Sequence, residues 1–333
     1  MPFNGMRTAR ESGLRNGSIR GSNRPARDQS RKNYASRTLP EPDASPWFLM
    51  RAMVAREPAH QIARPGPSAA TETAESTGYT VVKGQIIEWC WFGPPPDAAP
   101  TLVFLHEALG CVAAWRSFPR ALADRLGFGA FIYSRAGFGR SGPGVMPLPL
   151  DYHQREALEC LPELLNQAGI RQAVLVGHSD GGTMALLHAG VMRDPRVRAV
   201  VTMAAHVFNE DVTIQGIEAA KREYRDSFRQ PLTRYHGNKA SAVFCGWSDI
   251  WLSPAFRSWT IAPALAGITQ PLLAVQGEND RYGTLAQVDA IVEGVSGPAE
   301  RLIMHACGHV PHLEKKDELV DAVARFVGSL ELA

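Results

Sequence analysis

The strongest indication of the fold class is the segment Ala173-Val-Leu-Val-Gly-His-Ser-Asp-Gly-Gly182. A short apolar run, typical of a buried strand, leads directly into a Gly-x-Ser-x-Gly turn, and residues 183–189 have a helical composition. A serine on a sharp turn between a strand and a helix has strained backbone angles, and small neighbours keep that turn free of clashes. The first amides of a helix lack partners within it, so the Asp180 amide can stabilise an oxyanion. This pattern predicts Ser179 as a nucleophile.

Two further segments supply the partners that a serine nucleophile needs. Because a serine hydroxyl is a weak nucleophile at neutral pH, a base must take its proton and an acid must orient that base. Asp280 follows the apolar run at residues 271–275, and His309 follows a strand candidate that ends near Met304. We therefore predict Ser179, Asp280 and His309 as a catalytic triad.

Other histidines and carboxylates near these positions are alternatives. His305 and His312 lie within four residues of His309. We prefer His309 because Gly308 permits a loop that projects the side chain over the sheet edge, whereas His305 is expected to belong to the strand. For the acid, the alternatives to Asp280 are Glu278 and then Glu210 or Asp211.

A second amide for the oxyanion is expected from the loop after an early strand. The apolar run Thr101–Leu105 is followed by the stretch His106-Glu-Ala-Leu-Gly110. We assign the N–H of Ala108, with Leu109 as the alternative donor and an ordinary turn as the competing interpretation. Together with the Asp180 amide it would form an oxyanion hole, in which losing one donor typically costs about 10²- to 10³-fold in rate.

The pattern of apolar and polar residues after Tyr79 predicts an α/β fold. Short apolar runs alternate with amphipathic segments, as expected for a mostly parallel sheet that is covered by helices on both faces. Right-handed crossovers bring the carboxyl ends of parallel strands to one edge, so the residues that follow the strands converge there. The strand candidates are residues 80–92, 101–105, 130–134, 173–176, 197–203, 271–276 and 299–304. Helical periodicity is clearest at residues 152–168 and 318–326.

The chain divides into four segments. Residues 1–76 are polar and rich in Arg, Ser, Asn and Pro, so we expect a disordered basic extension. Residues 77–206 and 268–333 are the two parts of the α/β core. Between them, residues 207–267 hold no strand candidate and are rich in Arg and aromatic residues, which predicts a helical cap over the catalytic edge.

Composition limits the partners of the protein. Residues 1–75 carry 12 Lys/Arg against 7 Asp/Glu, whereas the remainder carries 23 against 26. The basic residues of the extension are scattered without interleaved aromatic residues, which argues against nucleic-acid binding. No apolar run is long enough to span a membrane. The five cysteines are odd in number and form no Cys-x-x-Cys pair, so we expect reduced, buried thiols, a cytoplasmic location and no metal site. No cofactor is expected, because triad chemistry requires none.

Residues 79–330 resemble the capped α/β-hydrolases, a group that includes esterases, meta-cleavage-product hydrolases, epoxide hydrolases and haloalkane dehalogenases. The resemblance rests on the turn at residues 177–182, on Ser-Arg-Ala-Gly-Phe-Gly-Arg-Ser at residues 134–141, and on Gly-His-Val-Pro-His-Leu-Glu at residues 308–314. It implies the α/β-hydrolase fold and the triad given above, in the family's chain order of Ser, Asp, His. One departure is Glu107, because the group commonly has glycine after the oxyanion-loop histidine.

The serine favours acyl transfer to water. Epoxide hydrolases and haloalkane dehalogenases resemble this chain in fold but use an aspartate at the elbow. The main prediction is therefore a carboxylic ester hydrolase acting on a small molecule, with a thioesterase as an alternative. A second alternative is a carbon–carbon bond hydrolase of the meta-cleavage-product type, in which Arg135 or Arg140 would bind the substrate's carboxylate.

Aromatic residues are the candidates for substrate contacts. Trp115, Phe138, Trp247 and Trp251 are predicted to line an apolar pocket beneath the cap. A non-catalytic binding protein on the same fold is the competing class of function. Turnover of a short p-nitrophenyl ester and labelling by a fluorophosphonate would separate an enzyme from a binding protein.

Overall fold

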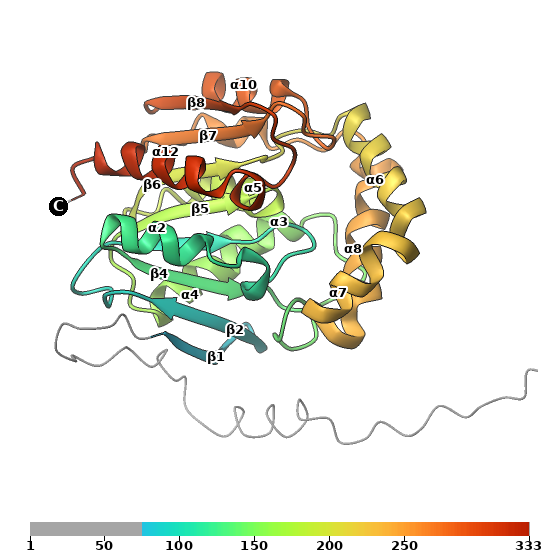
Figure 1. The fold of residues 1–333 in the computed structure, drawn as a ribbon, viewed down its shortest axis with the longest axis horizontal. Helices are drawn as coiled ribbons and strands as arrows, with labels where there is room; N and C mark the ends of the chain where they lie inside the picture. The colour runs from blue at the N-terminus through green and yellow to red at the C-terminus, as the bar shows by residue number, and fades with distance from the viewer. Residues whose placement is uncertain (1–74, 333) are drawn as a thin grey trace, which may run out of the picture. The chain divides into compact units, whose positions relative to one another are not determined.

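A computed structural model describes residues 75–332, which form an eight-stranded sheet in the order β1-β2-β4-β3-β5-β6-β7-β8 (Figure 1). β1 pairs antiparallel with β2, β2 pairs antiparallel with β4, and the remaining pairs are parallel. The strands are β1 (Ser76–Val82), β2 (Gln85–Phe92), β3 (Thr101–Leu105), β4 (Gly129–Ser134), β5 (Ala173–His178), β6 (Val197–Met203), β7 (Leu272–Gly277) and β8 (Ala299–Met304). The α-helices are α2 (Phe118–Leu126), α3 (Tyr152–Arg155), α4 (Leu161–Gln167), α5 (Asp180–Leu187), α6 (Asp211–Glu223), α7 (Arg229–His236), α8 (Ala240–Trp251), α9 (Ala262–Leu265), α10 (Leu285–Gly294), α11 (Pro311–Glu314) and α12 (Lys316–Gly328).

The central strands of the sheet are buried between two helical layers. All residues of β3 are buried, as expected for a central parallel strand that is covered on both faces. Alternate residues of this strand belong to two different apolar clusters: Val103 and Leu105 pack with residues of α4, α5 and α10, whereas Leu102 and Phe104 pack with residues of α2 and α12. In Figure 1, α2 and α12 cover the near face of the sheet. The predicted mostly parallel α/β fold is therefore confirmed.

Helices inserted between β6 and β7 lie at the carboxyl ends of the parallel strands (Figure 1). We refer to α6, α7 and α8 as the cap. The short helix α9 also falls within the predicted cap segment, residues 207–267, but it contacts α5 and α10 of the core. The insertion thus returns to the core layer before β7 begins.

The first strand candidate was wrong in one respect. Residues 80–92 were predicted as a single strand, but the chain turns within them and forms the β1–β2 hairpin. Lys83 and Gly84 both have left-handed backbones, with φ of +49° and +75°. Two successive left-handed residues form the hairpin turn whose twist matches that of the flanking strands. A Lys-Gly pair is a weaker turn signal than Asn-Gly, which explains the missed turn.

The helix predicted at residues 152–168 is also less regular than expected. α3 and α4 are joined by a wider turn of π type at Glu156–Cys160. Pro162 lies in the first turn of α4. Because proline has no backbone N–H and its ring collides with the carbonyl four residues earlier, the regular helical bonds cannot continue through it. The helix predicted at residues 318–326 is confirmed as the greater part of α12.

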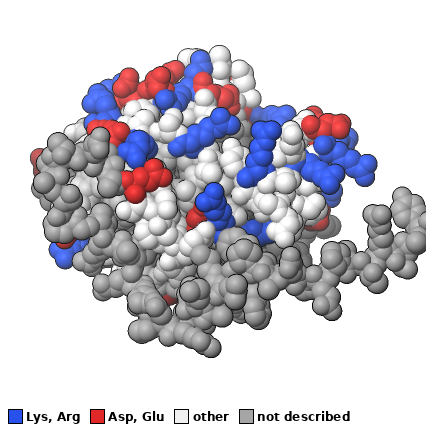
Figure 2. Space-filling model, turned by 60° about the horizontal axis from the view of Figure 1, so that its bottom comes forward, with Lys and Arg blue, Asp and Glu red and all other residues white. Residues whose placement is uncertain are grey.

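The predicted extension, residues 1–76, lies almost wholly outside the described residues; β1 begins at Ser76. Within residues 75–332, no helix combines the length and apolarity that crossing a bilayer requires. On the face seen in Figure 2, Lys and Arg side chains of the described residues are interspersed with Asp and Glu. None of the five cysteines forms a disulfide, but the expectation of burial fails for Cys245, which is exposed on α8, and holds only in part for Cys160, which is half-buried.

Candidate active site

Ser179 stands at the sharp turn between β5 and α5. Its φ of +50° and ψ of −117° lie outside the regions that non-glycine residues commonly adopt, and its amide donates to the Met203 carbonyl at 2.8 Å. The residues at positions 177 and 181 are glycines because other backbone atoms approach them closely. A Cβ on Gly177 would lie 2.3 Å from the carbonyl oxygen of Gly181, and a Cβ on Gly181 would lie 1.9 Å from that of Leu105. The turn therefore holds the serine in a strained conformation at the end of the strand.

The side chains of Ser179, His309 and Asp280 form one hydrogen-bonded chain. Nε2 of His309 lies 3.1 Å from Oγ of Ser179, and Nδ1 lies 2.9 and 2.8 Å from the two carboxylate oxygens of Asp280. Since a carboxylate only accepts hydrogen bonds, a neutral His309 carries its proton on Nδ1 and presents a bare Nε2 to the serine hydroxyl. In this arrangement an imidazole can take a proton from serine.

Asp280 is buried and held from several directions. Its side chain is 1% exposed; Oδ1 accepts from the Tyr282 amide at 2.8 Å, and Oδ2 accepts from Nε2 of Gln276 at 2.7 Å. Burial raises the pKa of Asp280, but the charge of His309 and the hydrogen bonds from His309 and the Tyr282 amide outweigh it, so the pKa lies below its ordinary value. Asp280 therefore remains an anion next to the imidazole.

The loop that carries His309 is held by Glu314. This carboxylate accepts from the amide of Gly308 at 2.7 Å and from the amide of Val310 at 3.0 Å. The residue with a left-handed backbone in this loop is Ala306, with φ of +48°, and not Gly308, so the loop does not use the conformational freedom of glycine for which His309 was preferred. Gly308 is instead in close contact with the carboxylate, since a Cβ there would lie 3.1 Å from Oε1 of Glu314.

The alternative histidines make other contacts. The side chain of His305 is 86% exposed, and its Nδ1 lies 3.3 Å from Oε2 of Glu278, the alternative acid. The ring of His312 packs 4.7 Å from the indole of Trp115, centroid to centroid. Burial, with the charge of nearby His178, lowers the pKa of His312 to about 3, so this imidazole is neutral. Neither histidine is within hydrogen-bonding distance of Ser179 in the described part of the chain.

The more distant alternative acids lie at the start of α6. Glu210 accepts from the amide of Thr284 at 3.0 Å and from its hydroxyl at 2.6 Å. Asp211 is exposed and lies 3.2 Å from a guanidinium nitrogen of Arg257. Both carboxylates are therefore paired with groups other than the imidazole of His309.

The predicted oxyanion loop, residues 106–110, is built around Arg135. The buried guanidinium donates through Nη1 to the His106 carbonyl and through Nη2 to the Glu107 carbonyl at 3.0 Å. The Arg135 amide donates to Nε2 of His106 at 3.0 Å, so Nδ1 of this ring donates to the Glu107 carbonyl at 2.7 Å. These bonds fix the backbone immediately before Ala108.

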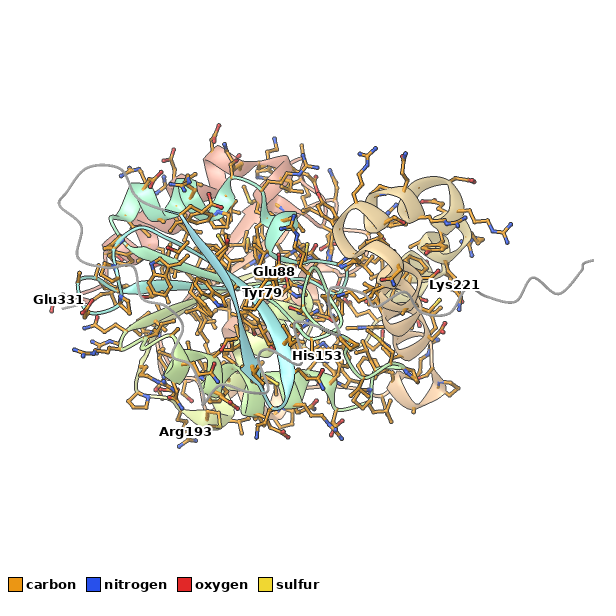
Figure 3. The ribbon with its side chains drawn as sticks, turned by 90° about the horizontal axis from the view of Figure 1, so that it is seen from below. Tyr79, Glu88, His153, Arg193, Lys221 and Glu331 are labelled. Atoms are coloured by element: carbon orange, nitrogen blue, oxygen red, sulfur yellow. The ribbon has the colours of Figure 1, made fainter. Side chains whose placement is uncertain are left out.

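The amide and the side chain of Asp180 face different surroundings. As the first residue of α5, Asp180 has an amide without a partner inside the helix. Its carboxylate accepts from the Tyr152 hydroxyl at 2.8 Å and lies 3.3 Å from Nε2 of His153. Burial raises the pKa of Asp180, but the charge of His153 outweighs it and the pKa is lowered. Figure 3 shows His153 near the junction of the core and the cap, which carries Lys221.

A pocket of about 460 Å³ lies between the triad and the cap. It reaches both Ser179 and His309, and the two assigned oxyanion candidates of the loop, Ala108 and Leu109, line it. Most of its other lining side chains are apolar, including Phe228, Pro231, Leu232, Tyr235 and Trp247 of the cap segment. The candidate nucleophile and base therefore open onto one apolar chamber.

Comparison with known proteins identifies the family. A family model described as alpha/beta hydrolase fold matches residues 100–263. Serine hydrolase BPHL of Mus musculus is 30% identical over 236 residues, which are 69% of this chain and 74% of that protein. The chain belongs to the α/β-hydrolase family.

Other relatives of this α/β-hydrolase act on different bonds. Epoxide hydrolase A of Mycobacterium tuberculosis is 24% identical over 301 residues, which are 70% of this chain and 92% of that protein. Among solved structures, a 2-hydroxy-6-oxo-6-phenylhexa-2,4-dienoate hydrolase from a Rhodococcus strain superposes with a TM-score of 0.64. That match covers 78% of this chain and 100% of the other at 17% identity, so it shows a shared fold. Together with the match to the mouse protein, these findings place the chain among the enzymes of the α/β-hydrolase family.

Two of the four aromatic residues predicted to contact substrate do not line the pocket of this α/β-hydrolase. Trp115 is 1% exposed and packs against Phe118 and Phe104 on the α2 side of the sheet. Phe138 is buried under the guanidinium of Arg135, which lies 4.7 Å from its ring centroid. Both side chains serve the core of the protein, where large aromatic surfaces are most often buried.

The other two aromatic residues lie near the triad. Trp247 lines the pocket of about 460 Å³, whereas Trp251 lines only a smaller chamber behind Ser179. The indole N–H of Trp251 donates to the Tyr152 hydroxyl at 3.0 Å. Trp251 thus fixes the partner of Asp180 in addition to closing the chamber.

Several residues that line the pocket were not predicted from the sequence. Arg281 and Tyr282 follow Asp280 directly and line the pocket, and Tyr235 and Leu232 reach it from α7. The position of Arg281 and Tyr282 just after a strand end was a usable signal, because that edge was already assigned to chemistry. The cap residues gave no comparable signal. No group of three or more His, Cys, Asp or Glu in residues 75–332 could hold a metal ion.

Proposed function

We propose that this α/β-hydrolase is a serine hydrolase that cleaves carboxylic esters of small molecules through Ser179, His309 and Asp280. The observation that carries the proposal is the contact of 3.1 Å between Oγ of Ser179 and Nε2 of His309, backed by the Asp280 carboxylate and open to an apolar pocket. A hydroxyl next to a bare imidazole nitrogen becomes nucleophilic when that nitrogen takes its proton.

The proposed course has two halves. Oγ of Ser179 attacks the carbonyl carbon of the ester while its proton passes to Nε2 of His309. The amides of Ala108 and Asp180 stabilise the oxyanion, and His309 returns the proton to the departing alcohol. Water then cleaves the acyl-enzyme and releases the acid.

The volume and the lining residues of the pocket support the class of substrate. Its volume of about 460 Å³ falls within the range of about 300–1,000 Å³ that is usual for small-molecule sites. Apolar side chains from α7 and α8, including Leu232, Tyr235 and Trp247, favour an aliphatic or aromatic acyl group. The similarity to a relative named as a serine hydrolase supports the same chemistry.

Epoxide hydrolysis is a less fitting function, although relatives with that name exist. Opening an epoxide by alkyl displacement calls for a carboxylate nucleophile, and this chain has Ser179 at the elbow. The carboxylate next to it, Asp180, is hydrogen-bonded to Tyr152 and is therefore not free to attack.

A carbon–carbon bond hydrolase is the second candidate, and Arg281 is the observation that favours it. Its side chain lines the pocket and lies 3.2 Å from the Tyr282 hydroxyl, where it could bind the carboxylate of a dienoic ketone acid. Arg135 and Arg140, the residues predicted for this role, do not line the pocket. Arg135 is committed to the His106 and Glu107 carbonyls instead.

A panel of substrates tests the proposal. Short and medium p-nitrophenyl esters, the matching thioesters, an aryl epoxide and a dienoic ketone acid are assayed with wild type and Ser179→Ala. We expect esters to be hydrolysed fastest and the variant to lose this activity. Equal rates for the two proteins would remove Ser179 as nucleophile, and a clear preference for thioester or ketone acid would replace the substrate class. A cytoplasmic location, resting on five unpaired cysteines, remains part of the proposal.

A further inference from the structure

A second, smaller chamber borders the same serine. It has a volume of about 20 Å³, slightly above the roughly 10–15 Å³ that one buried water requires. Both Ser179 and His309 line it, together with His206 from the loop after β6 and the cap side chains Trp247 and Trp251. The chamber can therefore hold a single water in contact with the nucleophile and the base.

His206 presents one bare nitrogen in these surroundings. Its Nε2 lies 2.9 Å from the Tyr282 carbonyl oxygen, and since a carbonyl only accepts, Nε2 carries the proton. Nδ1 is then an acceptor, and within residues 75–332 no protein group is hydrogen-bonded to it. Burial, with the charge of His309, lowers the pKa of His206, which agrees with a neutral ring. The residue is only 3% exposed, so a bare nitrogen here carries a desolvation cost unless a small donor reaches it.

Two other donors that line the chamber are engaged elsewhere. The Thr213 hydroxyl donates to the Tyr282 carbonyl at 2.6 Å, and the Trp251 indole donates to the Tyr152 hydroxyl at 3.0 Å. The Asp180 carboxylate can only accept. A molecule inside the chamber is therefore the donor that best fits Nδ1 of His206.

We propose that this chamber holds the water that cleaves the acyl-enzyme, and that His206 positions it. This inference rests on the proposed serine hydrolase function. The ring centroids of His206 and His309 are 5.9 Å apart, a separation that one bridging water can span. The water donates one hydrogen to Nδ1 of His206 and the other to Nε2 of His309, which directs an oxygen lone pair toward the acyl carbon.

During deacylation one proton passes from the water to Oγ of Ser179 by way of His309. The water oxygen forms a bond to the acyl carbon while its proton passes to Nε2 of His309. The tetrahedral intermediate then collapses, the bond between the acyl carbon and Oγ of Ser179 breaks, and His309 returns the proton to Oγ. The product leaves as a carboxylic acid. His206 keeps its own proton throughout, so it is a positioning residue and not a second base.

Two substitutions at His206 separate positioning from a structural role. In Gln the amide nitrogen is three bonds from Cβ, like Nε2 of histidine, so His206→Gln keeps a donor to the Tyr282 carbonyl and loses the acceptor. In Asn the amide oxygen is two bonds from Cβ, like Nδ1, so His206→Asn keeps the acceptor and loses the anchor. His305→Gln, at an exposed histidine, is the matched control.

The experiment measures acylation and deacylation separately by rapid mixing with a p-nitrophenyl ester and by the intact mass of the acyl-enzyme. We expect His206→Gln to slow deacylation by about 10²-fold, the scale of a misplaced reacting group, with little change in acylation. His206→Asn should slow deacylation less than His206→Gln. Accumulation of acyl-enzyme in His206→Gln would show directly that deacylation has become slow.

The opposite ranking would overturn the inference, because an anchoring role alone makes Asn the more damaging change. Equal losses in acylation and deacylation would overturn it too. If the wild type forms no acyl-enzyme at Ser179, the proposed function fails and the inference fails with it. If acylation proceeds but both variants deacylate like the wild type, only the role of His206 is lost.

Discussion

Nε2 of His236, at the end of cap helix α7, lies 2.9 Å from the carbonyl oxygen of Leu109 in the oxyanion loop. The opposite nitrogen, Nδ1, accepts from the amide of Gly139 at 2.9 Å. One neutral tautomer, with the proton on Nε2, satisfies both contacts. A single buried imidazole thus joins the cap to two loops of the core, and a second proton on it would remove the bond to Gly139.

The His236 contacts predict a stability that falls in acid. Burial lowers the pKa of His236 below its ordinary 6.5; the charges of Lys239 and Arg135 add to this shift, while the hydrogen bond to the Leu109 carbonyl and the charge of Glu107 oppose it. Above pH 6.5 both folded and unfolded states are neutral at this site, and its contribution to stability is fully present. Below pH 6.5 the unfolded state binds a proton that the folded state resists, so stability is lost as the pH falls toward the folded pKa.

Urea unfolding at pH 8 and pH 5 measures this loss. His236→Gln should lose less stability between the two pH values than the wild type, because it has no proton to bind. His305→Gln, at an exposed histidine, should lose as much as the wild type. An unchanged pH dependence in His236→Gln would contradict this account of the cap contact.

Glu107, the departure from the family pattern, is predicted to stabilise the elbow through His178. Its Oε2 lies 3.4 Å from Nδ1 of His178, whose Nε2 lies 2.7 Å from the His309 carbonyl. Burial raises the pKa of Glu107, but the hydrogen bond with His178 and its charge outweigh it, so the pKa is strongly lowered. Because the His309 carbonyl only accepts, Nε2 of His178 carries a proton, and Nδ1 faces the Glu107 carboxylate.

Removing the Glu107 carboxylate should leave a buried imidazole nitrogen unpaired, which typically costs about 1–3 kcal/mol. We expect Glu107→Ala to lose that much free energy of unfolding and Glu107→Gln to lose less, since its amide can donate to a neutral His178. Glu293→Ala, at an exposed position on α10, is the control. An alanine variant as stable as the wild type would show that the pair adds nothing.

The assignment of the acid is tested by comparing two neighbouring carboxylates. Asp280→Asn should lower kcat by on the order of 10⁴-fold, because the amide favours the wrong tautomer of the base. Glu278→Gln should leave kcat nearly unchanged, since Glu278 contacts the exposed His305. The reverse ranking would transfer the role of the acid to Glu278.

Arg135 is predicted to shape the oxyanion loop and not to bind substrate. A lysine replaces the planar fork, whose two nitrogens donate to the His106 and Glu107 carbonyls, with one nitrogen on a flexible stem, so Arg135→Lys should misplace the loop and lower kcat by about 10²-fold. Arg140→Lys, at an exposed position outside the pocket, should behave like the wild type. Steady-state kinetics with one ester decides: an effect on KM alone at Arg135 would favour a binding role.

The sequence was sufficient to predict candidate site residues where a local pattern determines their geometry. Ser179 was identifiable because a strand, a glycine-flanked serine and a helix are contiguous in the chain. Asp280 and His309 could be matched to it because parallel strands end at one edge, and the structure brings all three side chains together.

The remaining features depend on tertiary packing that no local pattern encodes. Trp115 and Trp247 look alike in the sequence, yet one is buried beside α2 and the other faces the pocket. The apolar residues of α7 gave no hint of which face meets the core, since helix rotation is fixed by contacts with distant segments. His206 could not be singled out because its bare nitrogen is visible only once the Tyr282 carbonyl is placed beside it.

The most direct test of the serine nucleophile is to locate a covalent adduct. Wild type and Ser179→Ala are treated with a fluorophosphonate, digested and analysed by tandem mass spectrometry. The account predicts one adduct on Ser179 in the wild type, no adduct in the variant, and ester hydrolysis that is lost together with labelling. An adduct on a different residue, or a variant that hydrolyses esters at the wild-type rate, would contradict it.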